Sequence, residues 1–179
     1  MSPEASTADA VQHAMAQGAM TEAYQAEPQP VIQALHRLRV TDVSSDLQYK
    51  QYASMAVSLC APGLKDDCEA HATLERQHAD LLAQRIQQLG GVPIYSPVDI
   101  AAQAASVGVR PEQGPTLREM ILENLMLERQ QVAAYTTLVR ELGEEDLTTR
   151  RLLLEILAET ERHASELADD LKNTAEAWP

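Results

Sequence analysis

The sequence predicts an all-α protein, built as an antiparallel four-helix bundle in which a long crossover joins two helix pairs. Hydrophobic residues make up 45% of the 179 residues, yet only seven residues are glycine. The long segments are dominated by Ala, Leu, Gln, Glu and Arg, which favour helices. In four segments the apolar residues recur at steps of three and four, which places them on one face of a helix.

The first two predicted helices form one pair. The first runs from Val31 to about Cys60, with the buried stripe Leu35, Leu38, Asp42, Ser45, Tyr49, Tyr52, Ala56 and Leu59. The second follows Pro62 and Gly63, with the stripe Cys68, His71, Glu75, His78, Leu82, Ile86 and Leu89. Two glycines and Pro93 then act as a C-cap and a stop signal.

The second pair follows a connection of about 20 residues, 94–114, whose periodicity is weak and whose length requires a reason. Thr116 and Glu119 form a predicted capping box. The third helix then continues to Gly143 with the stripe Leu117, Ile121, Leu125, Glu128, Val132, Tyr135, Val139 and Leu142. The fourth begins near Asp146, with the stripe Leu153, Ile156, Thr160, His163, Leu167 and Leu171.

These segments predict a single bundle domain over residues 31–175, preceded by a tail, residues 1–30, with at most one short helix. The net charge is −13 and the tail contains no Lys or Arg, so we expect cations as partners and no nucleic acid. We expect no membrane association and a cytoplasmic location, because the chain has neither a leader-like start nor an apolar run of about 18 residues. Cys60 and Cys68 are expected to be unpaired in a reducing compartment, although a bridge between them is geometrically possible.

Acids, phenols and histidines occupy matched positions in the two halves. The first half carries Asp42, Tyr49, Glu75 and His78, and the second carries Glu128, Tyr135, Thr160 and His163. Each residue follows its counterpart by 85 or 86 positions. The two pairs are therefore built on one plan.

Three carboxylates buried at similar depth require compensating cations, because an unpaired buried carboxylate costs several kcal/mol. No Lys or Arg lies on the stripes beside Asp42, Glu75 and Glu128, whereas two imidazoles do. Carboxylate with imidazole is a ligand set of iron, manganese or zinc. We therefore favour a metal site over a structural polar network, which stays the alternative.

Three further residues have two interpretations each. The matched positions of Tyr49 and Tyr135, two helical turns from an acid, suggest phenols that hydrogen-bond the ligand carboxylates, rather than plain core aromatics. His71 lies one turn before Glu75 on the same stripe. In one interpretation His71 supports the ligands or lines the access path of the metal. In the other it is a core histidine whose hydrogen bonds are made within the protein.

Residues 30–171 resemble the ferritin-like superfamily of di-iron carboxylate bundles, which use a Glu from each of two helices and Glu-x-x-His from the other two. Within it the chain is most similar to the bacterioferritin-related, Dps-like branch. The segments that carry the resemblance are "TDVSSDLQYKQY", "LERQHADLLAQRIQQLGGVP", "LENLMLERQQVAAY" and "LEILAETERHASEL".

The resemblance implies five metal ligands: terminal Asp42 and Glu128, bridging Glu75, and one imidazole for each metal from His78 and His163. These five residues would also be the catalytic residues. Asp42 replaces the usual Glu and is one methylene shorter. Thr160 stands where the family has its second bridging Glu, so either Glu159 swings inward to replace it or one metal position is weak or absent.

The resemblance further implies iron as the cofactor, in a di-iron site or as one metal only, with zinc or manganese as alternatives. Arg76 stands where bacterioferritins have their haem-ligating Met, so no haem is expected. The missing fifth helix favours a homo-oligomer of about 12 subunits over the larger shell.

The leading hypothesis is an iron-storage and detoxification protein, with ferroxidase activity if the altered site is competent. It would oxidise Fe(II) with peroxide or oxygen and store Fe(III) in a hollow shell. The alternatives are a non-catalytic or mononuclear metal-binding shell, which Thr160 motivates, and a di-metal enzyme that acts on peroxide without storing iron.

Overall fold

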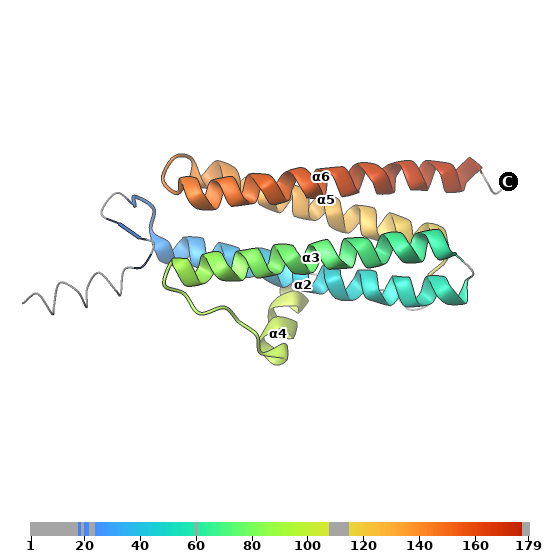
Figure 1. Cartoon of the computed structure of the whole chain (residues 1–179), viewed down its shortest axis with the longest axis horizontal. Helices are drawn as coiled ribbons and strands as arrows, with labels where there is room; N and C mark the ends of the chain where they lie inside the picture. Colours follow the sequence, from blue (N-terminus) through green and yellow to red (C-terminus); the bar gives the residue numbers. More distant parts are fainter. Residues whose placement is uncertain (1–17, 19, 22–23, 60, 108–114, 177–179) are drawn as a thin grey trace, which may run out of the picture.

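The computed structural model describes residues 18, 20–21, 24–59, 61–107 and 115–176. These residues contain five helices and no strand, which confirms the all-α prediction (Figure 1). The helices are α2 (Pro28–Ser58), α3 (Pro62–Gln88), α4 (Pro97–Val107), α5 (Leu117–Leu142) and α6 (Leu147–Glu176). Most of the predicted N-terminal tail lies outside the described residues. Among the described helices, none is both long and apolar enough to cross a bilayer.

The helix ends follow the local chemistry of the sequence. Proline occupies the first turn of both α2 and α3, where its fixed φ suits a helix start. The predicted capping box is confirmed, because Glu119 N donates to Thr116 Oγ1 at 3.3 Å and Thr116 N donates to Glu119 Oε2 at 2.7 Å. At the end of α3, Gly90 has φ +82°, and a Cβ on Gly91 would lie only 2.8 Å from the Ile86 side chain.

The helices pack as two pairs, as predicted. Helix α2 packs mainly against α3 and α5 mainly against α6, while smaller contacts join α2 to α5 and α3 to α6. Figure 1 shows the two pairs lying lengthwise against each other, with α4 outside the bundle on the α2 side. The bundle therefore has one shared interior to which all four long helices contribute side chains.

The crossover differs from the prediction, since its weakly periodic segment forms α4. The Ala-rich sequence PVDIAAQAASV favours a helix, and Ser96 Oγ accepts a hydrogen bond from Asp99 N at 3.4 Å in its first turn. Arg39 of α2 fixes the start of the crossover, because its guanidinium donates to the Ile94 carbonyl and lies 4.4 Å from the centre of the Tyr95 ring.

The interior is apolar towards its ends and polar between them. A large apolar cluster includes Leu35, Leu82, Ile86, Tyr135 and Leu153, and a smaller one includes Tyr49, Tyr52, Cys68, Ala72 and Met120. Tyrosines from both clusters hydrogen-bond to buried acids, so the polar centre lies between the clusters. Cys68 is a buried free thiol whose pKa is raised by burial to about 12, and Cys60 lies outside the described residues.

Candidate metal centre

The five predicted ligands are all buried in the bundle, with at most 2% of their surface exposed. Asp42 lies on α2, Glu75 and His78 lie on α3, Glu128 lies on α5 and His163 lies on α6. Each residue belongs to the inward stripe of its helix. The helical periodicity therefore carries three carboxyl groups and two imidazoles into one interior.

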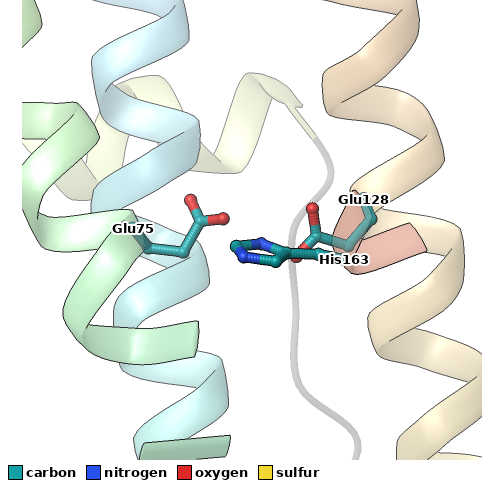
Figure 2. Close-up of side chains that lie close together, drawn as sticks. All are labelled: Glu75, Glu128 and His163. Carbon is teal, nitrogen blue, oxygen red and sulfur yellow. The ribbon is translucent and has the colours of Figure 1, made fainter. Parts of the chain in front are cut away.

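Three of the five form a tight group. Ligand atoms of Glu75, Glu128 and His163 all lie within 4.8 Å of one another, and the imidazole lies between the two carboxyl groups (Figure 2). His163 Nδ1 is 3.6 Å from Glu128 Oε1. In the part of the chain that the structure describes, no other group of three His, Cys, Asp or Glu side chains meets this distance.

The chemistry of this group fits a metal ion. Glu75 Oε1, Glu128 Oε2 and His163 Nδ1 are all buried and none has a hydrogen-bond partner. Buried polar atoms normally have partners, because leaving one unpaired costs roughly 1–3 kcal/mol. Two carboxylate oxygens and one imidazole nitrogen are also a donor set that iron, zinc or manganese accepts.

Asp42 and His78 lie outside the tight group. Both Asp42 oxygens accept from the Tyr135 hydroxyl, at 2.7 and 2.8 Å, and one also accepts from Gln131 Nε2 at 3.2 Å. His78 Nε2 lies 2.8 Å from Glu159 Oε2, while its buried Nδ1 has no partner. The residues predicted to hold a second metal ion therefore form no tight group, and other side chains already contact them.

The tyrosines hydrogen-bond to the acids, which confirms the prediction made for them, but they do so crosswise. Tyr49 of α2 donates to Glu128 Oε1 at 2.5 Å, and Tyr135 of α5 donates to Asp42. Burial and the neighbouring acids raise the pKa of both phenols well above the ordinary value. Both tyrosines therefore stay protonated donors that orient one acid from each helix pair.

Gln131 is a member of the centre that the sequence analysis missed. Its Nε2 donates to Glu75 Oε2 at 2.8 Å and also to Asp42, so it links acids from two helices. It follows Glu128 by three residues, as His78 follows Glu75. That repeated spacing was the signal that could have identified it.

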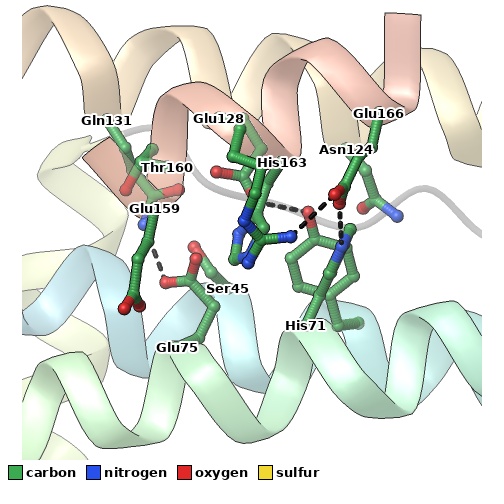
Figure 3. A network of polar contacts seen from close by, with 12 residues as sticks. Ser45, His71, Glu75, Asn124, Glu128, Gln131, Glu159, Thr160, His163 and Glu166 are labelled. Carbon is green, nitrogen blue, oxygen red and sulfur yellow. Dashed lines mark hydrogen bonds and ion pairs between the residues drawn. The ribbon is translucent and has the colours of Figure 1, made fainter. Parts of the chain in front are cut away.

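Thr160 faces the centre but supplies no carboxylate (Figure 3). It is fully buried, and its hydroxyl donates to the Ile156 carbonyl at 3.0 Å. Glu159 does not replace the missing acid, because it contacts the outer nitrogen of His78 and its side chain is 49% exposed. Glu159 therefore pairs with His78, and a hydroxyl lies where the resemblance predicts a second bridging Glu.

A cation contacts His163 on the outer side of the ring. Arg162 Nη2 lies 3.1 Å from His163 Nε2, and Nη1 donates to Glu166 Oε1 at 2.7 Å. The His71 ring stacks on His163 with 4.3 Å between centroids, and His71 Nε2 lies 3.5 Å from Glu166 Oε2. His71 therefore supports a predicted ligand and is not an isolated core histidine.

Burial in the centre favours bound protons on two of its acids. Burial raises the pKa of Asp42 to about 7. Burial, together with the charges of Asp42 and Glu128, raises the pKa of Glu75 well above its ordinary value. Burial lowers the pKa of His78, which keeps its imidazole neutral and able to bind metal. The raised pKa values of Asp42 and Glu75 thus favour protons on these two acids, where a cation could also compensate the charge.

Comparisons with known proteins agree with the helical fold. The family model described as the ferritin-like domain matches residues 32–177. Among solved structures, the chain is similar to the bacterioferritin-related protein from Bacteroides fragilis, described as a dodecameric thioferritin. The TM-score is 0.75 with 26% sequence identity, over 86% of this chain and 90% of that chain. A search of curated proteins found no match.

Proposed function

This chain belongs to the ferritin-like family, and from that premise we propose that it is an iron-storage subunit that binds Fe(II) inside its bundle. One observation supports the proposal above all others. Glu75, Glu128 and His163 converge from three helices and leave one buried atom each without a hydrogen-bond partner. The two carboxylate oxygens can bind a cation without first breaking a hydrogen bond, and the imidazole nitrogen faces them.

The proposed site has two unequal positions. Glu75, Glu128 and His163 hold the first ion. Asp42 and His78 hold a second ion and share Glu75 with the first, after Asp42 gives up part of its hydrogen bonding to Tyr135 and Gln131. Because ligand carboxyl groups must be ionised, binding either ion displaces protons from the centre.

Two bound ions match the electron count of the proposed oxidation. Hydrogen peroxide needs two electrons for cleavage of its O–O bond, and each Fe(II) gives up one. With two protons taken up, the products are two Fe(III) ions and two water molecules. The buried phenols hold Glu128 and Asp42 in place during the reaction, and the Fe(III) formed is the material that the protein stores.

A second candidate function is mononuclear metal binding without rapid oxidation. Two observations favour it: Thr160 brings a hydroxyl to the second bridging position, and Asp42 is already engaged by Tyr135. A single iron ion supplies only one electron, so reduction of peroxide to two water molecules would then require a second Fe(II) from elsewhere. Zinc in such a site would bind without electron transfer.

The assembly that we propose is a closed homo-oligomer. The similar protein from Bacteroides fragilis is dodecameric, which supports a shell of about 12 copies of this chain. Light scattering of the purified protein measures the mass directly. A monomeric or dimeric mass would contradict storage in a shell while leaving metal binding possible.

Anaerobic titration of the metal-free protein with Fe(II), followed by peroxide or oxygen, tests the site. Two ions per chain and rapid growth of Fe(III) absorbance would support the storage proposal. One ion with slow oxidation would favour the mononuclear candidate. His36→Ala, which changes a histidine on α2 that is not among the predicted ligands, is the control, and loss of binding in that variant would contradict the assignment.

A further inference from the structure

Arg162 contacts His163 from the outer side of the bundle. Its Nη2 lies 3.1 Å from His163 Nε2, while its Nη1 is held by Glu166 Oε1 at 2.7 Å. Figure 3 shows Glu166 beside His71 and His163, at the outer edge of the polar centre. The Arg162 side chain is 52% exposed, so it can leave the imidazole for solvent without opening the core.

The hydrogen-bonding chemistry of arginine fixes the roles in this contact. A guanidinium offers only donors, so His163 Nε2 accepts. A neutral imidazole that accepts at Nε2 carries its proton on Nδ1. Yet Nδ1 is the nitrogen that faces Glu128, at 3.6 Å, and it has no hydrogen-bond partner. The atom placed to bind metal is therefore protonated while Arg162 is in contact.

His78 has the opposite arrangement. A carboxylate offers only acceptors, so Glu159 Oε2, 2.8 Å away, accepts from the His78 Nε2–H. The lone pair of His78 is then on Nδ1, which is buried and without a partner. A carboxylate behind a histidine ligand orients it and increases its basicity, whereas a guanidinium in the same place does neither.

We propose that Arg162 competes with the metal ion for His163, an inference that rests on the proposed metal site. For Nδ1 to bind metal, its proton must be lost to solvent and a proton must be carried on Nε2. The Nε2–H and the guanidinium N–H would then face each other, so Arg162 must withdraw. Glu166 keeps hold of the withdrawn guanidinium, and Arg162 thereby lowers the affinity of the first metal position.

Anaerobic Co(II) titration of the full chain, followed by the visible absorbance of the bound ion, tests the competition. Arg162→Leu removes the donor and keeps an apolar side chain, and we expect about tenfold tighter Co(II) binding. Arg151→Leu is the matched control, because Arg151 lies on the same helix and pairs with Glu155 at the same spacing, far along α6 from His163. It removes the same charge without touching a histidine.

Two further measurements separate a direct contact from simple charge repulsion. Raising the salt concentration screens the charge of an exposed guanidinium, so tighter binding by Arg162→Leu that persists at high salt supports direct competition. Solid-state 15N spectra of the metal-free protein, assigned with His163→Gln, should show the Nδ1–H form in the unaltered chain and a changed form in Arg162→Leu.

The outcomes are distinct. Unchanged affinity, or a gain that vanishes at high salt or equals that of Arg151→Leu, would overturn the role of Arg162 and leave the metal site intact. An Nε2–H form of His163 in the unaltered chain would overturn it as well. Absence of Co(II) binding in every variant would overturn the proposed metal site itself, and the inference with it.

Discussion

The two halves of the polar centre are incomplete in opposite ways. In the His163 half, Glu75 and Glu128 have free oxygens, but Arg162 contacts the outer nitrogen of the imidazole. In the His78 half, a carboxylate orients the imidazole, but the terminal acid Asp42 is held by Tyr135. The two halves thus differ in Arg162, Glu159 and Tyr135, which are not among the proposed ligands. In the proposed site, these neighbours act together with the hydroxyl of Thr160 to make the two positions unequal.

Removing the acid that both halves share should have the largest effect. Glu75→Gln keeps the shape of the side chain and its contact with Gln131, but it removes the charge that both ions need. We expect Fe(II) and Co(II) affinity to fall roughly a thousandfold, or about 4 kcal/mol, at both positions. Anaerobic titration measures both steps. The control is Glu161→Gln, which changes an exposed acid on α6. Unaltered affinity for the first ion in Glu75→Gln would contradict the proposal that both ions share Glu75.

The sequence predicted the bundle well because its signals are local. The stripes, the prolines at helix starts and the capping box all act within a few residues, and they place the helix ends within a few positions of those observed. The prediction failed in the crossover, where eleven residues were too few to give a clear period and α4 was missed. Its Ala-rich composition was the better guide there.

The centre was less predictable than the bundle because side chains reach across helices. Burial of the five predicted ligands follows from the stripes, but their distances do not. Gln131 follows Glu128 at the spacing of His78 from Glu75, yet an amide gives no ligand signal by itself. Arg162 lies off the stripe, and only the end of its long side chain contacts the imidazole of His163. Such contacts depend on rotamers, which the sequence pattern does not specify.

Single substitutions of the two histidines should separate the two halves. We expect His163→Ala to lower the affinity for the first Fe(II) ion roughly a hundredfold. His78→Ala should change the affinity for the first ion by less than about threefold and should lower the affinity for the second. Isothermal titration measures the binding of each ion. Co(II) takes the place of Fe(II) in this measurement, because it stays divalent during the titration. If His78→Ala has the larger effect on the first ion, the ranking of the two halves is reversed.

The pH dependence of stability should expose the cost of burying Asp42. Its pKa is about 7 in the folded chain against an ordinary 3.8, so the folded state binds the extra proton between these values. Stability contributed by this group is therefore lost as pH rises through that window. Relative to the unaltered chain, metal-free Asp42→Asn should gain about 2 kcal/mol in unfolding free energy between pH 5 and pH 7.5.

Urea unfolding of the metal-free protein at both pH values measures this difference. The lowered pKa values of His36, His71 and His78 act in the opposite direction, but they are common to both proteins and largely cancel in the comparison. Glu75, whose pKa is also raised, strengthens the same trend in the unaltered chain. A difference that stays constant with pH would mean that Asp42 is ionised throughout.

Restoring a carboxylate at the second bridging position should have the smallest effect. In Thr160→Glu the new acid replaces the hydroxyl that now bonds to Ile156, and we expect about tenfold tighter binding of the second Fe(II), or about 1.4 kcal/mol. Anaerobic titration followed by peroxide measures both the second step and the oxidation rate. Thr160→Gln introduces a side chain of the same size as Glu but without its charge, and it should not increase the affinity for the second ion. If it gains as much, side-chain size and not charge limits the second position, and the two halves differ for a reason other than the missing acid.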